Sequence, residues 1–568
     1  MAGPADAEAR QPGLPRGGPG LRVVRRRIVR GAPSWSALVG AVLCYCLSFT
    51  PSLIPRPWWL QAAAAAITAA FGYAIGAFLG AVARRCGARP GPRWRRAGWL
   101  LLAVLGTAAV LGVTARSVRW QGDLRRAVGM APQVVWWQWA LVLPLAVLLC
   151  AVLVLLARLV RLGTRALARP LRRWVHPAVA AGVAVAVAAV VVVGLVQGFL
   201  LRGLLDAAEG AASLTDRSTS PGIVRPELPT LSGSPASAES WDGLGAKGRD
   251  FIGRAPTAAE IAAVSGRPAK DPVRVYVGLG SADTLRERAG LAVAELERTG
   301  GFSRRVLVVA STTGSGWVNE QIAKPPEFMY DGDSAVVAMQ YSYLPSWISF
   351  LTEAEAADAG TALIDAVHER WARLPADARP RLLVAGESLG SYATERAYPA
   401  GVAELARQVD GALLVGPTPD NPIRRQVTDD REPGSPVWRP VYQGGGTVRF
   451  AQVAADFAVP AGPWTEPRIG YLQNGSDPVT WWEPELLWQR PAWLERPRAA
   501  DVSAAMRWYP LVTFWQVTCD LAAANDVPAG HGHRFGTFPT TAWAEIAPPA
   551  GWGPADTRRL AGYLAEHG

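Results

Sequence analysis

One short motif in the second half of the chain contains residues that could perform nucleophilic catalysis. It reads Gly386-Glu387-Ser388-Leu389-Gly390, and it directly follows the apolar run at residues 382–385. A strand, a sharp turn and a helix form the setting that a nucleophile elbow needs, and residues 391–397 are compatible with that helix. The motif therefore predicts that Ser388 is a catalytic nucleophile, although ordinary strand-to-helix loops can carry the same pattern.

The general base that a serine nucleophile needs must come from few histidines, because the chain contains five. His176 borders an apolar run, His368 precedes the motif, and His567 is the penultimate residue. His531 and His533 remain, in a glycine-rich loop well after Ser388. His533 is preferred because the aromatic Phe535 follows it by two residues, but His531 stays open as the alternative.

The catalytic acid is expected between the serine and the histidines, at the end of a strand. Residues 469–473 form an apolar run that leads into the polar turn Asn474-Gly475-Ser476-Asp477-Pro478. Asp477 could fix the tautomer of the histidine and stabilise its imidazolium form. The order Ser, Asp, His along the chain is typical of α/β-hydrolases. Weaker candidates for the acid are Asp420, Asp456 and Asp526.

The oxyanion hole of such an enzyme is expected to use two backbone amides. The first is the amide of Leu389, which follows the nucleophile, and the second lies in the loop after an earlier strand, at Thr312 or Thr313. No cofactor or metal is expected. The cysteines and histidines lack zinc spacing, and Gly278-Leu279-Gly280 lacks the third glycine of a dinucleotide fingerprint.

The region around these residues alternates between strand-like and helix-like segments. Apolar runs predict strands over residues 273–277, 306–310, 335–340, 382–385, 412–415 and 469–473. Helical patterns cover residues 283–298 and 352–373. Apolar strands separated by helices predict an α/β domain with a mostly parallel sheet covered on both faces. Residues 511–525, just before the histidines, are more typical of a helix than of a final strand.

The first 200 residues contain five apolar runs, at roughly residues 35–55, 60–82, 98–115, 138–157 and 177–199. Each is close to the ~20 residues that a helix needs to cross a bilayer. Five such runs with arginine-rich flanks predict transmembrane helices, whereas a single run could be a buried soluble helix. The run at residues 98–115 is the shortest of the five.

Arginines are unequally distributed among the loops of this region. The N-terminal tail and the loops after the second and fourth runs carry 19 of them, whereas the other loops carry five. Because cytoplasmic loops are enriched in arginine, the tail is expected in the cytoplasm. Five crossings of the plasma membrane then place everything after residue 200 on its extracytoplasmic side.

The charge balance changes after the last apolar run. The first 200 residues hold 24 arginines, no lysine and three acids, whereas the rest hold 34 basic and 43 acidic residues. Membrane topology explains the basic excess, so no nucleic-acid partner is expected. The predicted organisation is a basic cytoplasmic tail, a transmembrane domain of about five helices, a linker rich in small residues, and a hydrolase domain (residues 1–33, 34–200, 201–245 and 246–568).

Several longer blocks resemble a known family, the actinobacterial membrane-anchored α/β-hydrolase-like family that was formerly a domain of unknown function. In the N-terminal region the resemblance rests on residues 48–56, which read Ser-Phe-Thr-Pro-Ser-Leu-Ile-Pro-Arg. In the C-terminal region it rests on residues 274–279, 314–318, 340–347, 386–391 and 530–533. The resemblance implies a multi-span N-terminal domain followed by an α/β-hydrolase domain, and it implies no substrate.

These features together predict a membrane-anchored serine hydrolase, an esterase, lipase or acyltransferase that forms an acyl intermediate on Ser388. Tryptophans are frequent after residue 436, and apart from core packing they suit an acyl pocket or a bilayer surface. The expected substrate is therefore an ester in a membrane lipid or cell-envelope component. The alternative is a catalytically idle hydrolase fold that binds or organises the envelope. A transporter is disfavoured because the apolar runs carry almost no ionisable residues, and the oligomeric state is left open.

Overall fold

The computed structural model of the chain describes residues 34–344 and 353–567, apart from residue 89 and most of residues 172–214. The expected cytoplasmic tail, most of the fifth apolar run and the first part of the expected linker lie outside the described residues. Contacts divide the chain into two units. The first contains Met1–Cys46, Ala65–Leu111 and Leu143–Gly194, and the second contains Leu47–Ala64, Gly112–Val142 and Leu195–Gly568.

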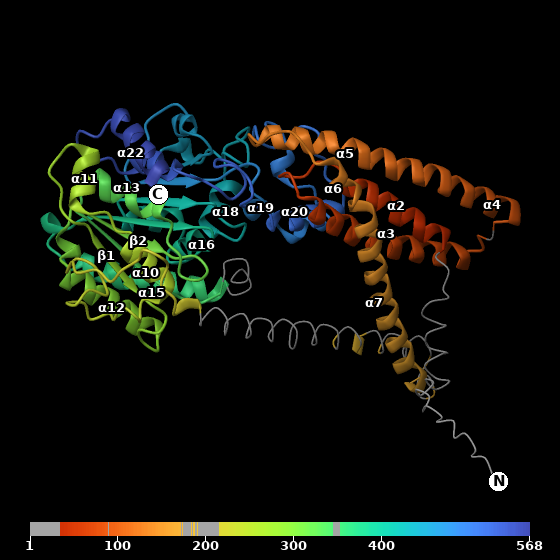
Figure 1. The fold of residues 1–568 in the computed structure, drawn as a ribbon, viewed down its shortest axis with the longest axis horizontal. Helices are drawn as coiled ribbons and strands as arrows, with labels where there is room; N and C mark the ends of the chain where they lie inside the picture. Colours follow the sequence, from red (N-terminus) through yellow and green to blue (C-terminus); the bar gives the residue numbers. More distant parts are fainter. Residues whose placement is uncertain are drawn as a thin grey trace, which may run out of the picture. The chain divides into compact units, whose positions relative to one another are not determined.

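A seven-stranded sheet forms the centre of the second unit (Figure 1). Its strands are β1 (Val273–Val277), β2 (Val306–Ser311), β3 (Ser334–Met339), β4 (Arg381–Glu387), β5 (Gly411–Val415), β6 (Val448–Ala451) and β7 (Arg468–Leu472). The order across the sheet is β1-β3-β2-β4-β5-β7-β6, and every pairing is parallel. The prediction of an α/β domain with a mostly parallel sheet is therefore confirmed.

Strand β6 is the one that the sequence did not predict. It has four residues at the edge of the sheet, and its apolar pattern is interrupted by Arg449. The guanidinium of Arg449 is nevertheless buried, because it donates to the carbonyls of Gly445, Phe457 and Gly462. A charged residue in a run of four residues interrupts the apolar pattern from which a strand is predicted.

Helices cover both faces of the sheet, as alternating strands and helices require. The helices of these layers are α10 (Gly245–Gly253), α11 (Ala258–Ser265), α12 (Leu285–Arg298), α13 (Glu320–Met329), α15 (Glu353–Ala372), α16 (Leu389–Arg396), α17 (Val402–Gln408), α18 (Pro422–Asp429), α21 (Phe538–Ile546) and α22 (Pro554–His567). Two further helices, α19 (Pro478–Trp481) and α20 (Val512–Leu521), pack in a separate apolar cluster with Leu53. Neighbouring strand residues alternate between two apolar cores. Val337 of β3 packs with α12 and α15, and Val336 packs with α13 and α21. Helix α20 confirms the helical prediction for the stretch before the histidines.

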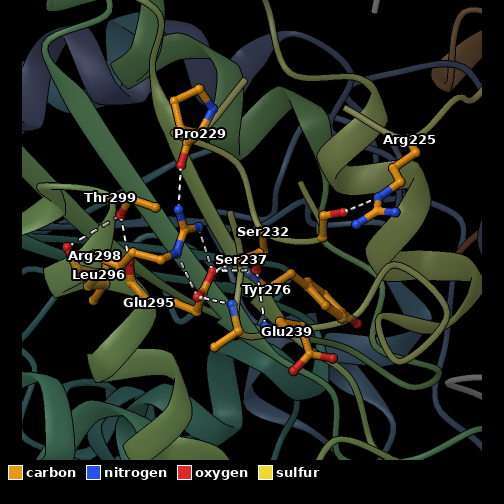
Figure 2. Close-up of polar contacts among 12 residues, drawn as sticks. Arg225, Pro229, Ser232, Ser237, Glu239, Tyr276, Glu295, Leu296, Arg298 and Thr299 are labelled. Carbon is orange, nitrogen blue, oxygen red and sulfur yellow. Dashed lines mark hydrogen bonds and ion pairs between the residues drawn. The ribbon is translucent and has the colours of Figure 1, made fainter. Parts of the chain in front are cut away.

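Part of the expected linker is packed against the sheet instead of forming a free tether. Leu231 pairs with Arg274 of β1, and both Leu231 and Leu244 are buried. Figure 2 shows the polar contacts that attach this segment to α12. The Glu295 carboxylate accepts from the hydroxyls of Ser232 (3.2 Å) and Ser237 (2.7 Å) and from the Arg298 guanidinium (2.7 Å). Small polar residues therefore suit close packing here, where composition alone indicated flexibility.

The N-terminal region contains three helices long and apolar enough to cross a membrane, among the described residues. They run over Trp58–Arg85, Pro92–Ala127 and Trp136–Pro170. The first is α3, the second joins α4 (Pro92–Leu101), a π-helical turn and α5 (Thr107–Ala127), and the third is mostly α7 (Val142–Leu171). The first apolar run forms the shorter helix α2 (Trp35–Ser48). Within the first unit, α2 and α3 approach closely at Gly40 and Gly72, where a side chain would clash with the opposite backbone, as at small-residue contacts between membrane helices.

Candidate active site

Ser388 occupies a strained turn between a strand and a helix. It follows β4 directly and precedes Leu389, the first residue of α16. Its backbone has φ 55° and ψ −122°, a conformation that residues with a side chain rarely adopt. Such strain is typical of a nucleophile elbow, which lifts the serine hydroxyl out of the sheet.

The two glycines of the motif are required by close backbone packing. A side chain at Gly386 would collide with the backbone of Gly390, and a side chain at Gly390 would collide with the Ser311 carbonyl at the end of β2. The turn can therefore close only with glycine at both positions. The motif is thus explained by the geometry around Ser388 and not by composition alone.

Asp477 and His533 form a buried pair. The Nδ1 atom of His533 lies 2.7 Å from Oδ2 of Asp477, and the Asp477 side chain is fully buried. The same carboxylate accepts from the Val479 amide (2.8 Å) and the Thr480 hydroxyl (3.2 Å). An ionised carboxylate can only accept, so Nδ1 must carry the proton and a neutral imidazole presents an unprotonated Nε2.

Backbone contacts bring the His533 ring next to the nucleophile turn. The Ser388 N–H donates to the carbonyl of Val415, at the end of β5, at 2.9 Å. The next residue, Gly416, has φ 53°, and a side chain there would collide with the His533 ring. Ser388, His533 and Asp477 therefore gather at the carboxyl ends of the strands, where ligands bind in open α/β sheets.

The loops that carry Asp477 and His533 are interlocked by hydrogen bonds. The Asn474 side chain donates to the Gly532 carbonyl at 2.8 Å, and the Ser476 hydroxyl accepts from the Gly532 N–H at 2.9 Å. Gly532 has φ 53° and allows no side chain, because one would clash with the Ala524 carbonyl. The histidine is thus positioned through its preceding residue.

His531 belongs to a second contact beside this pair. Its Nδ1 lies 3.3 Å from Oδ2 of Asp501, and the same oxygen accepts from the Ser476 hydroxyl at 2.6 Å. This contact is longer than the one between His533 and Asp477. The His531 side chain is also more exposed, with 24% of its surface accessible against 10% for His533. The geometry therefore favours His533 as the base and gives His531 a place at the edge of the loop.

The expected oxyanion donors lie on either side of the nucleophile. Leu389 begins α16, whose N-terminal turn stabilises negative charge. The Thr313 amide already donates to the Trp317 carbonyl at 3.1 Å. Because the Thr313 amide is occupied, Thr312 remains the candidate for the second donor, and its hydroxyl donates to the Met339 carbonyl at 2.8 Å.

The other acids considered from the sequence lie in different surroundings. Asp420 pairs with Arg425 at 2.9 Å, and Asp456 pairs with Arg439 while accepting from backbone amides. Asp526 is exposed in a turn. Of the four candidates, Asp477 is the one that contacts a histidine of the glycine-rich loop.

Glu387 is a charged neighbour of the site whose role the sequence did not indicate. It precedes the nucleophile, and its carboxylate accepts from the Asn319 side chain at 2.6 Å. Burial raises the pKa of Glu387, while the His533 ring and Asn319 oppose that rise. Burial also lowers the pKa of His533, but the carboxylates of Asp477 and Glu387 outweigh it, so that this pKa lies above its ordinary value.

Replacing Glu387 with glutamine is expected to shift the acid limb of the pH profile of kcat/KM to lower pH. A general base must be neutral, so activity falls as the pH drops through the pKa of His533. Removing one carboxylate disfavours the imidazolium and lowers that pKa. The shift should be smaller than the ~1–3 units of a direct ion-pair partner, because Asp477 keeps that contact. Profiles of wild type, E387Q and the exposed-site control E369Q test this, and an unchanged or raised limb in E387Q contradicts it.

The supporting residues of the site could not be found from sequence. Asn474, Ser476 and Asp501 act through backbone and side-chain contacts between loops that are distant along the chain. The one local sequence signal for these supporting contacts was glycine, because Gly416 and Gly532, which both lie near His533, have positive φ. Of these two, Gly416 is the one whose missing side chain leaves room for the His533 ring.

A cleft of about 530 Å³ lies beside the loop that carries the acid. Its wall includes Thr480, which donates to Asp477, and the side chains of Trp481, Trp482 and Trp493. Charged residues of both signs complete it, namely Asp420, Arg424, Arg425, Asp429, Arg431, Glu483 and Glu485. Aromatic faces mixed with charged groups suit an amphipathic ligand better than a plain hydrocarbon chain.

Comparisons with known proteins agree with this fold. A family model described as an alpha/beta-hydrolase family matches residues 273–560, which include all seven strands, Ser388, Asp477 and His533. A second model, described as the N-terminus of an alpha/beta-hydrolase family, matches residues 49–256. Searches of the curated proteins and of the solved structures each returned no match.

Proposed function

Because the chain belongs to the alpha/beta-hydrolase family, we propose that it is a serine hydrolase that acts on ester bonds through an acyl intermediate on Ser388. The observation that carries the proposal is the buried Asp477–His533 pair, with its 2.7 Å contact, beside a serine in a strained turn. The sequence motif around Ser388 would by itself be weaker support for a hydrolase, because ordinary strand-to-helix loops can carry the same motif.

The residues support a two-step acyl transfer. The Ser388 hydroxyl oxygen attacks the ester carbonyl carbon while its proton passes to Nε2 of His533, and Asp477 stabilises the resulting imidazolium. The amides of Leu389 and Thr312 stabilise the oxyanion. The imidazolium then donates the proton to the departing alkoxide oxygen, which leaves as an alcohol. Water or an acceptor alcohol, deprotonated by His533, then attacks the acyl carbon. The bond between that carbon and the Ser388 oxygen breaks, the serine oxygen regains the proton from His533, and the product acid or new ester is released.

An ester in a lipid or cell-envelope component is the proposed substrate. Among the described residues, three apolar helices precede the hydrolase domain, and they would keep Ser388 near a bilayer. The cleft beside Asp477 offers tryptophan faces together with charged groups, as an amphipathic molecule requires.

Purified full-length chain in nanodiscs is expected to cleave acyl esters presented in the bilayer with higher kcat/KM than short water-soluble esters. Remote binding energy from the acyl chain and headgroup should be used at the reacting centre. Both substrates are to be compared by product release in the same nanodisc preparation, with Ser388→Ala as the blank. Equal kcat/KM for both would contradict a lipid substrate while leaving the hydrolase itself in place.

Two segments of the N-terminal region support an extracytoplasmic hydrolase domain. Residues Leu47–Ala64 and Gly112–Val142 belong to the same unit as the sheet. They contain the arginine-poor stretches that the positive-inside rule assigns to the outside, together with the adjoining parts of α3 and α5. After the first of these segments, the three long apolar helices that contain α3, α5 and α7 would each cross the bilayer. Three crossings would leave the end of α7 on the side of the membrane opposite to Leu47–Ala64. The fifth apolar run of the sequence lies mostly outside the described residues, and the proposal requires it to return the chain to the side of the sheet.

Cysteine labelling of whole cells is expected to reach the hydrolase domain but not the α3–α4 loop. Cys86 in that loop is exposed and would be cytoplasmic, which makes it a natural internal control. Cys519 is a poor reporter, because it is buried and burial raises its pKa to about 11. An Ala550→Cys variant, at an exposed turn, should react with an impermeant maleimide in intact cells while Cys86 reacts only after lysis. The reverse pattern would contradict the topology.

A further inference from the structure

The segment between α2 and α3 is buried within the second unit, although it belongs to the N-terminal region. All six residues from Pro51 to Arg56 are buried, and Ser52, Leu53 and Ile54 have no exposed surface. A loop that only joined two membrane helices would be expected at the surface, since loops otherwise bury unpaired backbone groups. This burial needs a partner that supplies both polar and apolar contacts.

Helix α20 supplies the polar contacts. The Asp520 carboxylate accepts from the Ser52 hydroxyl and from the amides of Leu53 and Ile54, and it pairs with Nε of Arg56 at 2.9 Å. The side chains of Arg56 and Asp520 are both fully buried. One turn earlier, Gln516 donates to the carbonyls of Ser48 and Thr50 at 3.0 and 2.8 Å.

Leu53 packs beneath the loop that carries the acid. It lies in one apolar cluster with Trp481 and Trp493. Partly buried tryptophans join the same cluster, namely Trp438, Trp482 and Trp508. The Trp481 indole donates to the Asn474 carbonyl at 3.0 Å. Asn474 begins the turn that ends in Asp477, so Leu53 supports that turn through Trp481.

Ile54 packs beneath the loop that carries the histidine. It clusters with Ala523 and Val527, which follow α20. Between them, the Ala524 carbonyl accepts from the His533 N–H at 2.8 Å. Val527 also occupies the space into which a side chain at Gly532 would extend. Ile54 therefore contacts the residues that place the backbone of His533.

We propose that Pro51–Arg56 is a positioning segment for the catalytic loops, so that residues from the N-terminal region complete the active site of the hydrolase domain. Leu53 positions the Asp477 loop, and Ile54 and Arg56 position the His533 loop through Ala523–Val527 and α20. The inference rests on the proposed hydrolase function. It gives the N-terminal region a part in catalysis beyond anchoring.

The buried ion pair is better explained by positioning than by stability. Burial raises the pKa of Asp520 to about 6 against the opposing effects of Arg56 and Ser52. Buried pairs of this kind add little net stability compared with apolar side chains of similar size, but they accept only one geometry. An anchor alone would need no such geometry, because a tether can hold a domain to a membrane.

The test uses full-length chain in nanodiscs, with an acyl ester substrate and a fluorophosphonate probe. Ile54→Ala is expected to lower kcat on the order of ten-fold or more while KM changes little, because displacement of a catalytic group impairs the chemical step. Arg56→Met should act in the same direction. Both should slow labelling of Ser388. Ile54→Val, which removes one methyl group, serves if Ile54→Ala does not fold.

Matched controls separate positioning from general destabilisation. Ile261→Ala truncates an equally buried isoleucine in α11, and Arg274→Met breaks another buried arginine–carboxylate contact, with Glu327. Both should lower Tm but leave kcat near that of wild type at temperatures where the chain stays folded. In a His533→Ala background, Ile54→Ala should slow labelling no further, because the group that it positions is gone.

Equal losses of kcat in Ile54→Ala and Ile261→Ala would overturn the inference. So would an undiminished effect of Ile54→Ala in the His533→Ala background. If wild type is labelled and Ile54→Ala is labelled at the same rate, the positioning role fails and the hydrolase stands. If folded wild type is not labelled at all, the proposed hydrolase function fails first.

Discussion

Replacing Ser388 with alanine is expected to abolish covalent labelling by a fluorophosphonate and to reduce ester hydrolysis on the order of 10⁵–10⁶-fold. The strained turn places Ser388 at the N-terminus of α16, and its amide donates to Val415, whose neighbour Gly416 lies against the His533 ring. Alanine removes the atom that must form the acyl bond and leaves the turn otherwise unchanged. The remaining oxyanion amides can then accelerate only direct attack by water.

The measurement is probe labelling of purified full-length chain followed by peptide mapping. Ser303→Ala is the matched control, because Ser303 is an exposed serine outside the site. Wild type and Ser303→Ala should carry the label on the peptide that contains Ser388, and Ser388→Ala should carry none. A folded wild type that takes no label would favour the alternative of a catalytically idle fold that binds the envelope.

The fold and the elbow were predictable because their signals are local. Apolar runs of four to six residues mark buried parallel strands, and the run at β4 leads directly into Ser388. Asp477 could be proposed because it ends a strand at the right place in the order of the chain. The same reasoning missed β6, in which Arg449 breaks the apolar run of an edge strand.

The contacts that position the site were not predictable, because they join residues far apart in the sequence. Nothing near Arg56 indicates that it pairs with Asp520, and nothing near His531 indicates Asp501. Composition also misled at residues 228–244, where serine, proline and glycine indicated a tether. Those small residues instead allow the segment to lie against α12, with Glu295 accepting its hydroxyl groups.

Replacing His533 with alanine is expected to reduce kcat on the order of 10⁴–10⁶-fold, whereas His531→Ala should cost less than about ten-fold. His533 has the shorter carboxylate contact, at 2.7 Å against 3.3 Å, and its ring lies against Gly416, the residue after the backbone partner of Ser388. His531 contacts an oxygen of Asp501 that the Ser476 hydroxyl already occupies. Its loss should loosen the loop without removing the base.

The matched acid variants extend this comparison. Asp477→Asn should approach the loss of His533→Ala, because an amide at this position no longer fixes the Nδ1–H tautomer. Asp501→Asn should resemble His531→Ala. Steady-state kcat for the four variants, each checked for folding by thermal unfolding, gives the result. If His531→Ala and Asp501→Asn were the two inactive variants, His531 would be the base, and the Asp477–His533 pair would be a structural contact that fixes the loop.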